Sequence, residues 1–207
     1  PTGVAAINVG GSTLHSFFGI GLGTGSLSTL IKKVAKNKEA KKRIDETDVL
    51  CIDECSMLSS DLLETLDAVV REVRKDGTFK EEPFGGMQII AVGDFFQLPP
   101  IYRGDDMDRK WRPFCFDSPV WSDLGLMDNK LELKEVLRQG GETKFVQFLN
   151  MVRIGEVTES ILRDFNSKCM ISATHPLPTD GIVPTRLYVL NKDVDAINES
   201  RLAQLEG

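Results

Sequence analysis

Apolar residues along the chain fall into two alternating patterns, short continuous runs and longer runs at helical spacing. Residues 49–52 (VLCI) and 87–92 (MQIIAV) are apolar and too short for helices, so each run predicts a buried strand. Between them, residues 59–75 (SSDLLETLDAVVREVRK) show the spacing of an amphipathic helix. Ser59 or Ser60 is the candidate N-cap of that helix, because a serine hydroxyl can accept from a free amide of the first turn.

The alternation of strand and helix patterns continues towards the C-terminus. Residues 130–155 predict a strand, a turn and a helix, and residues 182–190 predict a further strand. Residues 191–207 predict a closing helix, with Asn191 as its candidate cap. Apolar strands that alternate with amphipathic helices are typical of an α/β layered fold with a largely parallel sheet.

Composition narrows the class of protein without deciding its function. The chain has 207 residues, 41% of them hydrophobic and 27% charged, as expected of a globular protein with a substantial core. We expect no membrane association, because no apolar run approaches the ~20 residues that a membrane span needs. We also expect no secretory leader, because no charged segment followed by an apolar run and a small-residue cleavage site opens the chain. The four cysteines lack paired CxxC spacing, which favours reduced thiols in an intracellular protein. The net charge of −6 excludes a simple polycation that coats nucleic acid.

Acidic residues follow both predicted strands of the first half. Asp53 and Glu54 come directly after the first strand, and Asp94 follows the second. Ligands of parallel α/β sheets bind at the carboxyl ends of strands. There a carboxylate can hold Mg²⁺ through water, and the next residue of an extended backbone points the other way and can orient an attacking water. The pair therefore predicts a Walker B element, with Asp53 on the metal and Glu54 as base. A helix-starting acid, a solvated turn or a glycosidase carboxylate pair are the alternative interpretations.

Two further side chains suit the same chemistry. Gln97 follows the acid of the second strand in a loop stiffened by two prolines. Its neutral amide can accept from a water and donate to a phosphate oxygen, as a phosphate sensor would. Arg138 lies beyond a predicted strand, where an arginine could stabilise the charge of a phosphoryl-transfer transition state. Taken singly, Gln97 also suits a surface turn and Arg138 a surface ion pair.

Four stretches in combination resemble a known family. Residues 1–23, 49–58 (VLCIDECSML), 83–100 (PFGGMQIIAVGDFFQLPP) and 133–139 (LKEVLRQ) resemble motifs Ia, II, III and IV of the petite integration frequency (PIF) helicases. These are superfamily-one, 5′-to-3′ DNA helicases. The resemblance extends through residues 114–121 and 181–202, and residues 83–100 are its most specific part.

The resemblance implies a fold and a set of site residues. It implies a RecA-like parallel sheet with flanking helices, forming an incomplete first motor domain over residues 1–120, and the start of a second RecA-like domain over residues 121–207. It also implies that the substrate is ATP with Mg²⁺ as cofactor. The implied roles are Asp53 for Mg²⁺, Glu54 for water activation, Gln97 as γ-phosphate sensor and Arg138 as arginine finger, and the implied contacts with single-stranded DNA are Thr2, His15 and Phe17.

Two stretches are candidates for contact with DNA. His15 offers a donor to the backbone and Phe17 or Phe18 a stacking platform for a base, although both rings also suit a core. Residues 27–48 show helical spacing, and residues 32–43 contain seven Lys or Arg and one acid. This basic stretch is a solvated helix face or a track for phosphates. The family places a small insertion of the first domain near residues 22–46, at the duplex junction, so we expect DNA contacts from Lys32, Lys33 and Lys36.

The sequence departs from the family pattern in one respect. No G-x-x-x-x-G-K-[ST] phosphate loop occurs among the 207 residues. The family's loop lies upstream of residue 1 and its later motifs lie beyond residue 207, so we expect a partial chain that hydrolyses ATP negligibly by itself.

Three functions stay open from the sequence. The first is an ATP-dependent 5′-to-3′ DNA helicase that acts as a monomer on single-stranded and forked DNA. It would serve DNA repair, recombination and telomere or genome maintenance in the nucleus or mitochondrion. The second is a module that binds single-stranded DNA without hydrolysing ATP, which the missing lysine favours. The third, a metal-dependent phosphatase, leaves Gln97 and Arg138 unexplained.

Overall fold

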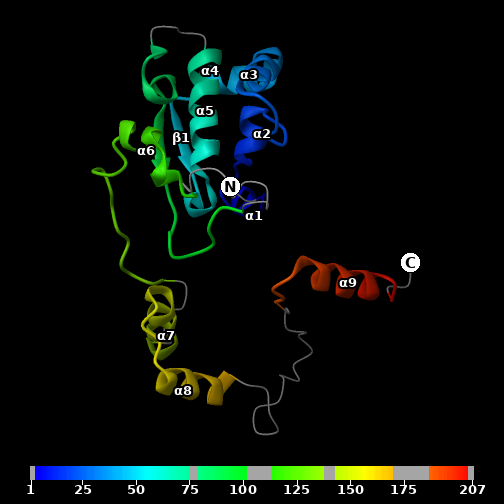
Figure 1. Cartoon of the computed structure of the whole chain (residues 1–207), viewed down its shortest axis with the longest axis vertical. Coiled ribbons are helices and arrows are strands. Elements are labelled where there is room, and N and C mark those ends of the chain that lie inside the picture. Colours follow the sequence, from blue (N-terminus) through cyan, green and yellow to red (C-terminus); the bar gives the residue numbers. More distant parts are fainter. Residues whose placement is uncertain (1–2, 75–78, 102–112, 138–142, 170–186, 205–207) are drawn as a thin grey trace. The chain divides into compact units, whose positions relative to one another are not determined.

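A computed structural model describes residues 3–74, 79–101, 113–137, 143–169 and 187–204 (Figure 1). The chain divides into two compact units, Pro1–Glu156 and Val157–Gly207. The first unit contains all of the described strands and most of the buried residues, and it carries the candidate site. The expected boundary between motor domains near residue 120 stays a prediction.

The two strands predicted from the first half are present and pair in parallel. β1 (Val49–Ile52) lies beside β2 (Gln88–Ala91), with Val49 opposite Gln88 and Ile52 opposite Ala91. Leu50, Ile52 and Ile89 point into the core, while the residues between them face outwards. The parallel arrangement confirms the α/β class, and it brings the carboxyl ends of both strands to one edge of the sheet.

The helix that covers the sheet begins at the predicted cap. α5 (Ser60–Val73) has Ser59 as its N-cap, and the Ser59 hydroxyl accepts from the Leu62 amide at 3.2 Å. One face of α5 carries apolar side chains that are almost fully buried against the core: Leu63, Leu66, Val69, Val70 and Val73. α5 is therefore the central helix of the first unit, and Figure 1 shows it running alongside β1.

The basic stretch forms two helices where the sequence predicts one continuous pattern. α3 (Leu27–Lys36) and α4 (Lys38–Glu46) meet at Asn37, which ends the first helix and caps the second. The Asn37 side chain accepts from the Ala40 amide at 3.1 Å. An asparagine at this position offers the backbone a side-chain partner in place of the next helical carbonyl, which breaks the pattern. Two short helices that the sequence did not reveal, α1 (Gly3–Asn8) and α2 (Leu14–Phe18), precede them.

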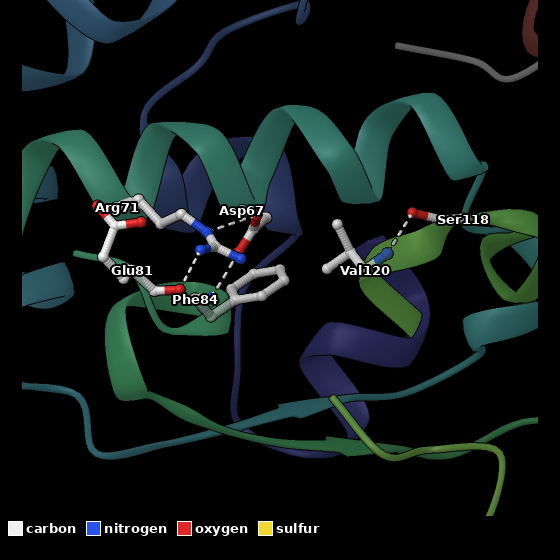
Figure 2. A network of polar contacts seen from close by, with 6 residues as sticks. All are labelled: Asp67, Arg71, Glu81, Phe84, Ser118 and Val120. Carbon is white, nitrogen blue, oxygen red and sulfur yellow. Dashed lines mark hydrogen bonds and ion pairs between the residues drawn. The ribbon is translucent and has the colours of Figure 1, made fainter. Parts of the chain in front are cut away.

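A buried carboxylate fixes the turn that leads into β2 (Figure 2). The short helix η3 (Pro83–Gly86) places Phe84 at φ 50°, a left-handed conformation that is strained for a bulky residue. Asp67 of α5 accepts from the Phe84 amide at 2.6 Å and from Arg71 Nε at 2.8 Å, and Arg71 Nη1 donates to the Glu81 carbonyl at 2.6 Å. The PFGG part of the motif thus has a structural role, because it anchors β2 to α5.

An aromatic cluster surrounds Phe95 after β2. Phe95 makes edge-on contacts with the rings of Phe114, Phe116 and Trp121, at centroid distances of 6.2, 4.8 and 6.0 Å. Phe116 belongs to the short helix η5 (Cys115–Asp117), Phe114 is the N-cap residue of η5, and Trp121 belongs to α6 (Pro119–Asp123). Ser118 caps α6 by accepting from the Val120 amide at 3.2 Å, as Figure 2 shows. The cluster supports the loop that carries Phe95 and its neighbours.

The remaining helices only partly match the predicted elements. α7 (Thr143–Ile154) is the predicted helix, and α8 (Glu159–Cys169) was not predicted. α9 (Asn191–Leu202) begins at Asn191, so Leu190 occupies the N-cap position and the prediction of Asn191 as cap is wrong by one residue.

Both strands predicted for this half are wrong over the described residues. Residues 130–137 and 187–190 have no strand structure, while residues 182–186 of the second predicted strand lie outside the described residues. Leu131 and Leu133 are 88% and 84% exposed. A strand needs a neighbouring strand for its backbone hydrogen bonds, and the described part of the chain offers none there. Among the same residues, no helix has the length and apolarity to cross a bilayer.

Candidate functional site

The site lies where the backbone leaves β1 and β2. The pairing of the strands continues past their ends, since the Val92 amide donates to the Ile52 carbonyl at 2.8 Å and the Cys55 amide donates to the Val92 carbonyl at 2.9 Å. Asp53 and Glu54 follow Ile52, and Asp94 comes two residues after Val92. The acids of both strands therefore emerge at the same edge of the sheet, as the sequence predicts.

Glu54 has a strained backbone. Its φ of 53° and ψ of 45° lie in the left-handed region, which costs a residue other than glycine about 1–3 kcal/mol. The expectation of an extended backbone at this position is wrong, because the chain turns at Glu54 into the short helix η1 (Cys55–Met57). The turn is held by the Glu54 amide, which donates to Asp53 Oδ1 at 2.9 Å. Strain of this kind at a half-buried acid is typical of functional sites.

Gly93 allows the two strand ends to approach. A Cβ atom at this position would lie 2.8 Å from Cys55 Sγ and 2.9 Å from the Cys55 backbone nitrogen. Cys55 is itself buried, and the Cys115 thiol donates to its carbonyl at 3.3 Å. The neighbouring Cys115 thiol lowers the pKa of Cys55, and the Cys55 thiol together with burial raises the pKa of Cys115. The backbone after Glu54 is thus packed tightly against the start of the loop that follows β2 (residues 92–100, the Asp94 loop).

The Asp94 loop holds Gln97 by two contacts. The Gln97 backbone amide donates to the Asp94 carbonyl at 2.9 Å, and the Gln97 side-chain amide donates to Asp94 Oδ2 at 3.3 Å. Arg153 of α7 forms an ion pair with the same carboxylate at 2.8 Å. The Arg153 guanidinium holds the pKa of the Asp94 carboxyl below its usual range, and Asp94 in turn raises the pKa of Arg153. Asp94 is therefore a cation-bound carboxylate that organises its own loop.

Asp53 fits the role of a magnesium ligand. Mg²⁺ in proteins keeps several waters and is held by one or two carboxylates together with substrate phosphates, so it needs no cage of protein ligands. Over the described residues, no group of three or more His, Cys, Asp or Glu side chains converges on one point. Asp53 offers a half-buried carboxylate at the strand end, and within the described part of the chain only its Oδ1 is engaged, by the Glu54 amide. This donor set matches a Mg²⁺ that arrives with a nucleotide.

The aromatic pair near the N-terminus divides into a core ring and an accessible ring. Phe18 is fully buried, whereas Phe17 is half-buried and packs edge-on against it at 5.0 Å. Arg43 donates to the Phe17 carbonyl at 3.0 Å, and its guanidinium lies 5.8 Å from the Phe17 ring centroid. His15 is also half-buried. Of the two rings, only Phe17 is placed to meet a base.

A hollow of about 210 Å³ connects this region with the strand end. Asp53 and Phe17 both line it, so the expected metal ligand and the expected stacking residue belong to one surface. The other lining residues come from the N-terminal segment and from β1: Ala6, Val9, Gly11, Ser12, Leu14, Leu50, Cys51 and Ile52.

The predicted basic residues differ in their surroundings. Lys32 and Lys36 are exposed on α3. Lys33 is exposed as well, but its ammonium donates to the Ile20 carbonyl at 3.1 Å. Because Ile20 follows α2 by two residues, this bond connects α3 to the segment after α2. Two of the expected site residues, Thr2 and Arg138, lie outside the described residues.

One residue of the site was missed by sequence reasoning. Arg153 lies 59 positions from Asp94 and sits in a helix pattern that gives no local signal of its role. A basic residue near the end of a helix ordinarily suggests only a favourable dipole interaction.

Comparison with known proteins gives consistent matches. A family model described as PIF1-like helicase matches residues 1–162. The chain is 40% identical over 206 residues to the ATP-dependent DNA helicase PIF1 of Saccharomyces cerevisiae, and 39% identical over 206 residues to that of Homo sapiens. All of the chain is covered in both cases, but it spans only 22% and 30% of the two relatives.

Solved structures match over the same extent. The crystal structure of Pif1 helicase from Candida albicans superposes with a TM-score of 0.83 at 40% identity, covering 100% of this chain and 43% of that one. The Pif1 helicase from Bacteroides, in complex with ADP-AlF3 and ssDNA, superposes with a TM-score of 0.71 at 30% identity, covering 100% and 47%. These neighbours agree with a RecA-like α/β fold for this chain.

Proposed function

This chain belongs to the PIF1-like helicase family, and from that premise we propose that it is part of an ATP-dependent DNA helicase. The helicase would move 5′-to-3′ on single-stranded DNA as a monomer and unwind forked duplexes, with roles in repair, recombination and telomere maintenance. Its compartment would be the nucleus or the mitochondrion. Residues 1–120 would belong to the first motor domain and residues 121–207 to the second.

The observation that carries the proposal is the meeting of two acidic strand ends. The register of β1 and β2 supports a single site in which Asp53, Glu54 and Gln97 of the Asp94 loop act together. The chemistry that Mg²⁺ supplies in such a site is neutralisation of charge on the transferring phosphate. Asp53 would hold that ion through water, and Glu54 would accept a proton from the attacking water. Gln97 would orient the water and contact the γ-phosphate, and Arg138 would stabilise transition-state charge.

The DNA-binding role would fall to another set of residues. Phe17 would stack on a base, His15 and Thr2 would contact the backbone, and the amines of Lys32 and Lys36 would neutralise phosphates. Lys33 would contribute less than its neighbours, because its ammonium already has the Ile20 carbonyl as a partner.

A second function rests on the missing phosphate loop. The 207 residues contain no G-x-x-x-x-G-K-[ST], so this polypeptide by itself would hydrolyse ATP negligibly and would act as a module that binds single-stranded DNA. The sequence of the coding region that contains this chain separates the two functions, since the helicase requires a phosphate loop elsewhere in the same protein.

Glu54→Gln in the complete protein tests the helicase proposal. We expect DNA-stimulated ATPase activity to fall by about 10²-fold or more, because general-base catalysis contributes on that scale. Affinity for single-stranded DNA should stay near that of the wild type, because the substitution keeps the shape of the side chain. Glu46→Gln, an exposed acid at the end of α4, is the control and should change neither quantity. Equal losses of hydrolysis and DNA binding in Glu54→Gln would assign the residue a structural role instead.

A further inference from the structure

The Asp94 carboxylate accepts four hydrogen bonds. Oδ2 accepts from Arg153 Nε at 2.8 Å and from Gln97 Nε2 at 3.3 Å. Oδ1 accepts from Arg153 Nη2 at 3.0 Å and from the Phe96 amide at 3.1 Å. Both oxygens are engaged, so Asp94 has little capacity left for a metal ion, although it follows a strand as Asp53 does.

Arg153 contacts this loop in two ways. Its guanidinium makes the paired, fork-like contact with Asp94 that a lysine cannot make. The same guanidinium lies 4.7 Å from the centroid of the Phe96 ring, within the range of a cation–π interaction. A single side chain of α7 therefore fixes both the carboxylate and the residue that precedes Gln97.

The ionised carboxylate determines how the Gln97 amide is turned. An ionised carboxylate only accepts hydrogen bonds, so Gln97 must present its NH₂ group to Asp94. Among the described residues, that contact leaves the Gln97 carbonyl oxygen and one N–H without a partner, and the side chain is exposed. The free oxygen can accept from a water while the free N–H donates to a phosphate oxygen, which are the two contacts that a phosphate sensor makes.

We propose that Arg153 is a positioning residue for ATP hydrolysis, which acts through Asp94 by holding the Gln97 amide in one orientation. This inference rests on the proposed function, because it gives Gln97 its role. It assigns to α7 a part in the site that no motif of the sequence indicates.

The charge around Asp94 predicts a shift of the pH profile. The charged group that faces Asp94 is Arg153 of α7, and Glu132, in the segment before α7, adds to the field at Arg153. Arg153 keeps Asp94 ionised at lower pH than an isolated carboxyl would be. Removing the guanidinium lets Asp94 take up a proton at higher pH, and a protonated carboxyl no longer fixes the amide. The acid limb of the ATPase profile should therefore move to higher pH in Arg153→Gln.

Steady-state ATPase kinetics of the complete protein test the proposal. In Arg153→Gln we expect kcat to fall by about tenfold, a modest part of the ~10²-fold that misplacement of a catalytic group can cost, with KM for ATP nearly unchanged. Arg153→Lys should recover part of the loss, because it restores the charge but not the paired contact. The matched control is Arg163→Gln, an exposed arginine of α8 whose Nε donates to the Glu159 carbonyl of its own helix, and it should behave as the wild type.

A double variant separates action through Asp94 from any other action. If Arg153 works only through Asp94, then Asp94→Asn/Arg153→Gln should be no slower than Asp94→Asn alone. A further loss in the double variant, equal to the loss from Arg153→Gln in the wild type, would overturn the proposal. So would wild-type kcat with an unshifted acid limb in Arg153→Gln. The Glu54→Gln variant distinguishes failure of this inference from failure of the proposed function. If Glu54→Gln is inactive and Arg153→Gln is fully active, the role of Arg153 is refuted and the proposed function is not.

Discussion

Replacing Asp67 by alanine should lower the free energy of unfolding of the first unit more than any other single acid-to-alanine change on α5. Asp67 is buried, and its two oxygens hold the Phe84 amide at 2.6 Å and Arg71 Nε at 2.8 Å. The Phe84 amide belongs to a turn with φ 50°, so the carboxylate holds a backbone conformation that the turn does not favour by itself.

The magnitude follows from the groups that lose a partner. A buried amide left without an acceptor costs about 1–3 kcal/mol. The ion pair contributes about 1 kcal/mol or less, because Arg71 is partly exposed and keeps the Glu81 carbonyl as a partner. Asp67→Ala should therefore lower the free energy of unfolding by about 2–4 kcal/mol. Asp67→Asn keeps an acceptor for the Phe84 amide and should cost only about 1 kcal/mol.

Urea unfolding of the 207-residue chain, followed by circular dichroism at about 222 nm, measures both values. The control is Asp61→Ala, an exposed acid in the first turn of the same helix, for which we expect about 0.5 kcal/mol from the helix dipole. Hydrogen exchange at the Gln88 amide, which donates to the Asp48 carbonyl at 2.9 Å, should accelerate in Asp67→Ala because the turn leads into β2. Equal stabilities of the alanine and asparagine variants would refute the assignment of the lost energy to the orphaned amide.

Two other consequences concern the aromatic pair and the ion pair of the site. Phe17→Ala should weaken the binding of single-stranded DNA by about 1–3 kcal/mol in a fluorescence titration and leave the fold intact. Phe18→Ala should instead lower the free energy of unfolding by about 3–5 kcal/mol. Unimpaired DNA binding in a folded Phe17→Ala variant would show that this ring does not contact DNA. Asp94 has a lowered pKa in the fold, so its contribution to stability is complete above the usual carboxyl pKa and is lost as the pH falls through the lowered value. Because the pair is partly exposed, Asp94→Asn should remove no more than about 1 kcal/mol at neutral pH, and this difference should shrink as the pH falls below the usual carboxyl range. A difference that stays constant over that fall in pH would contradict the assignment.

The parts of the fold that the sequence predicted are those with strong local signals. The two apolar runs formed β1 and β2 because each was short, bounded by polar residues and separated by a helix with a clear cap at Ser59. The parallel direction of the two strands follows from the covalent order of strand, helix and strand, and it accounts for the meeting of Asp53 and Asp94 at one edge.

The parts that sequence reasoning missed depend on single capping residues or on distant contacts. Asn37 divided a continuous helical pattern through one side-chain hydrogen bond, and Thr13 capped α2 inside a stretch rich in glycine. The left-handed turn at Glu54 could not be predicted, because the residue there is not a glycine. Arg153 meets Asp94 across 59 residues of chain, a distance over which no periodicity carries information. The site was therefore predictable as a set of strand-end acids, and its supporting contacts were not.

Binding of Mn²⁺ together with ADP to the complete protein, followed by electron paramagnetic resonance, tests the central claim most directly. Over the residues that the structure describes, Asp53 has one carboxylate oxygen without a partner, whereas both oxygens of Asp94 are engaged by Arg153, Gln97 and the Phe96 amide. Asp53→Asn should weaken Mn²⁺ binding by about tenfold or more, and Asp94→Asn should leave it within about threefold of the wild type. Equal weakening in the two variants, or normal Mn²⁺ affinity in Asp53→Asn, would contradict the assignment of this strand end as the metal and nucleotide site.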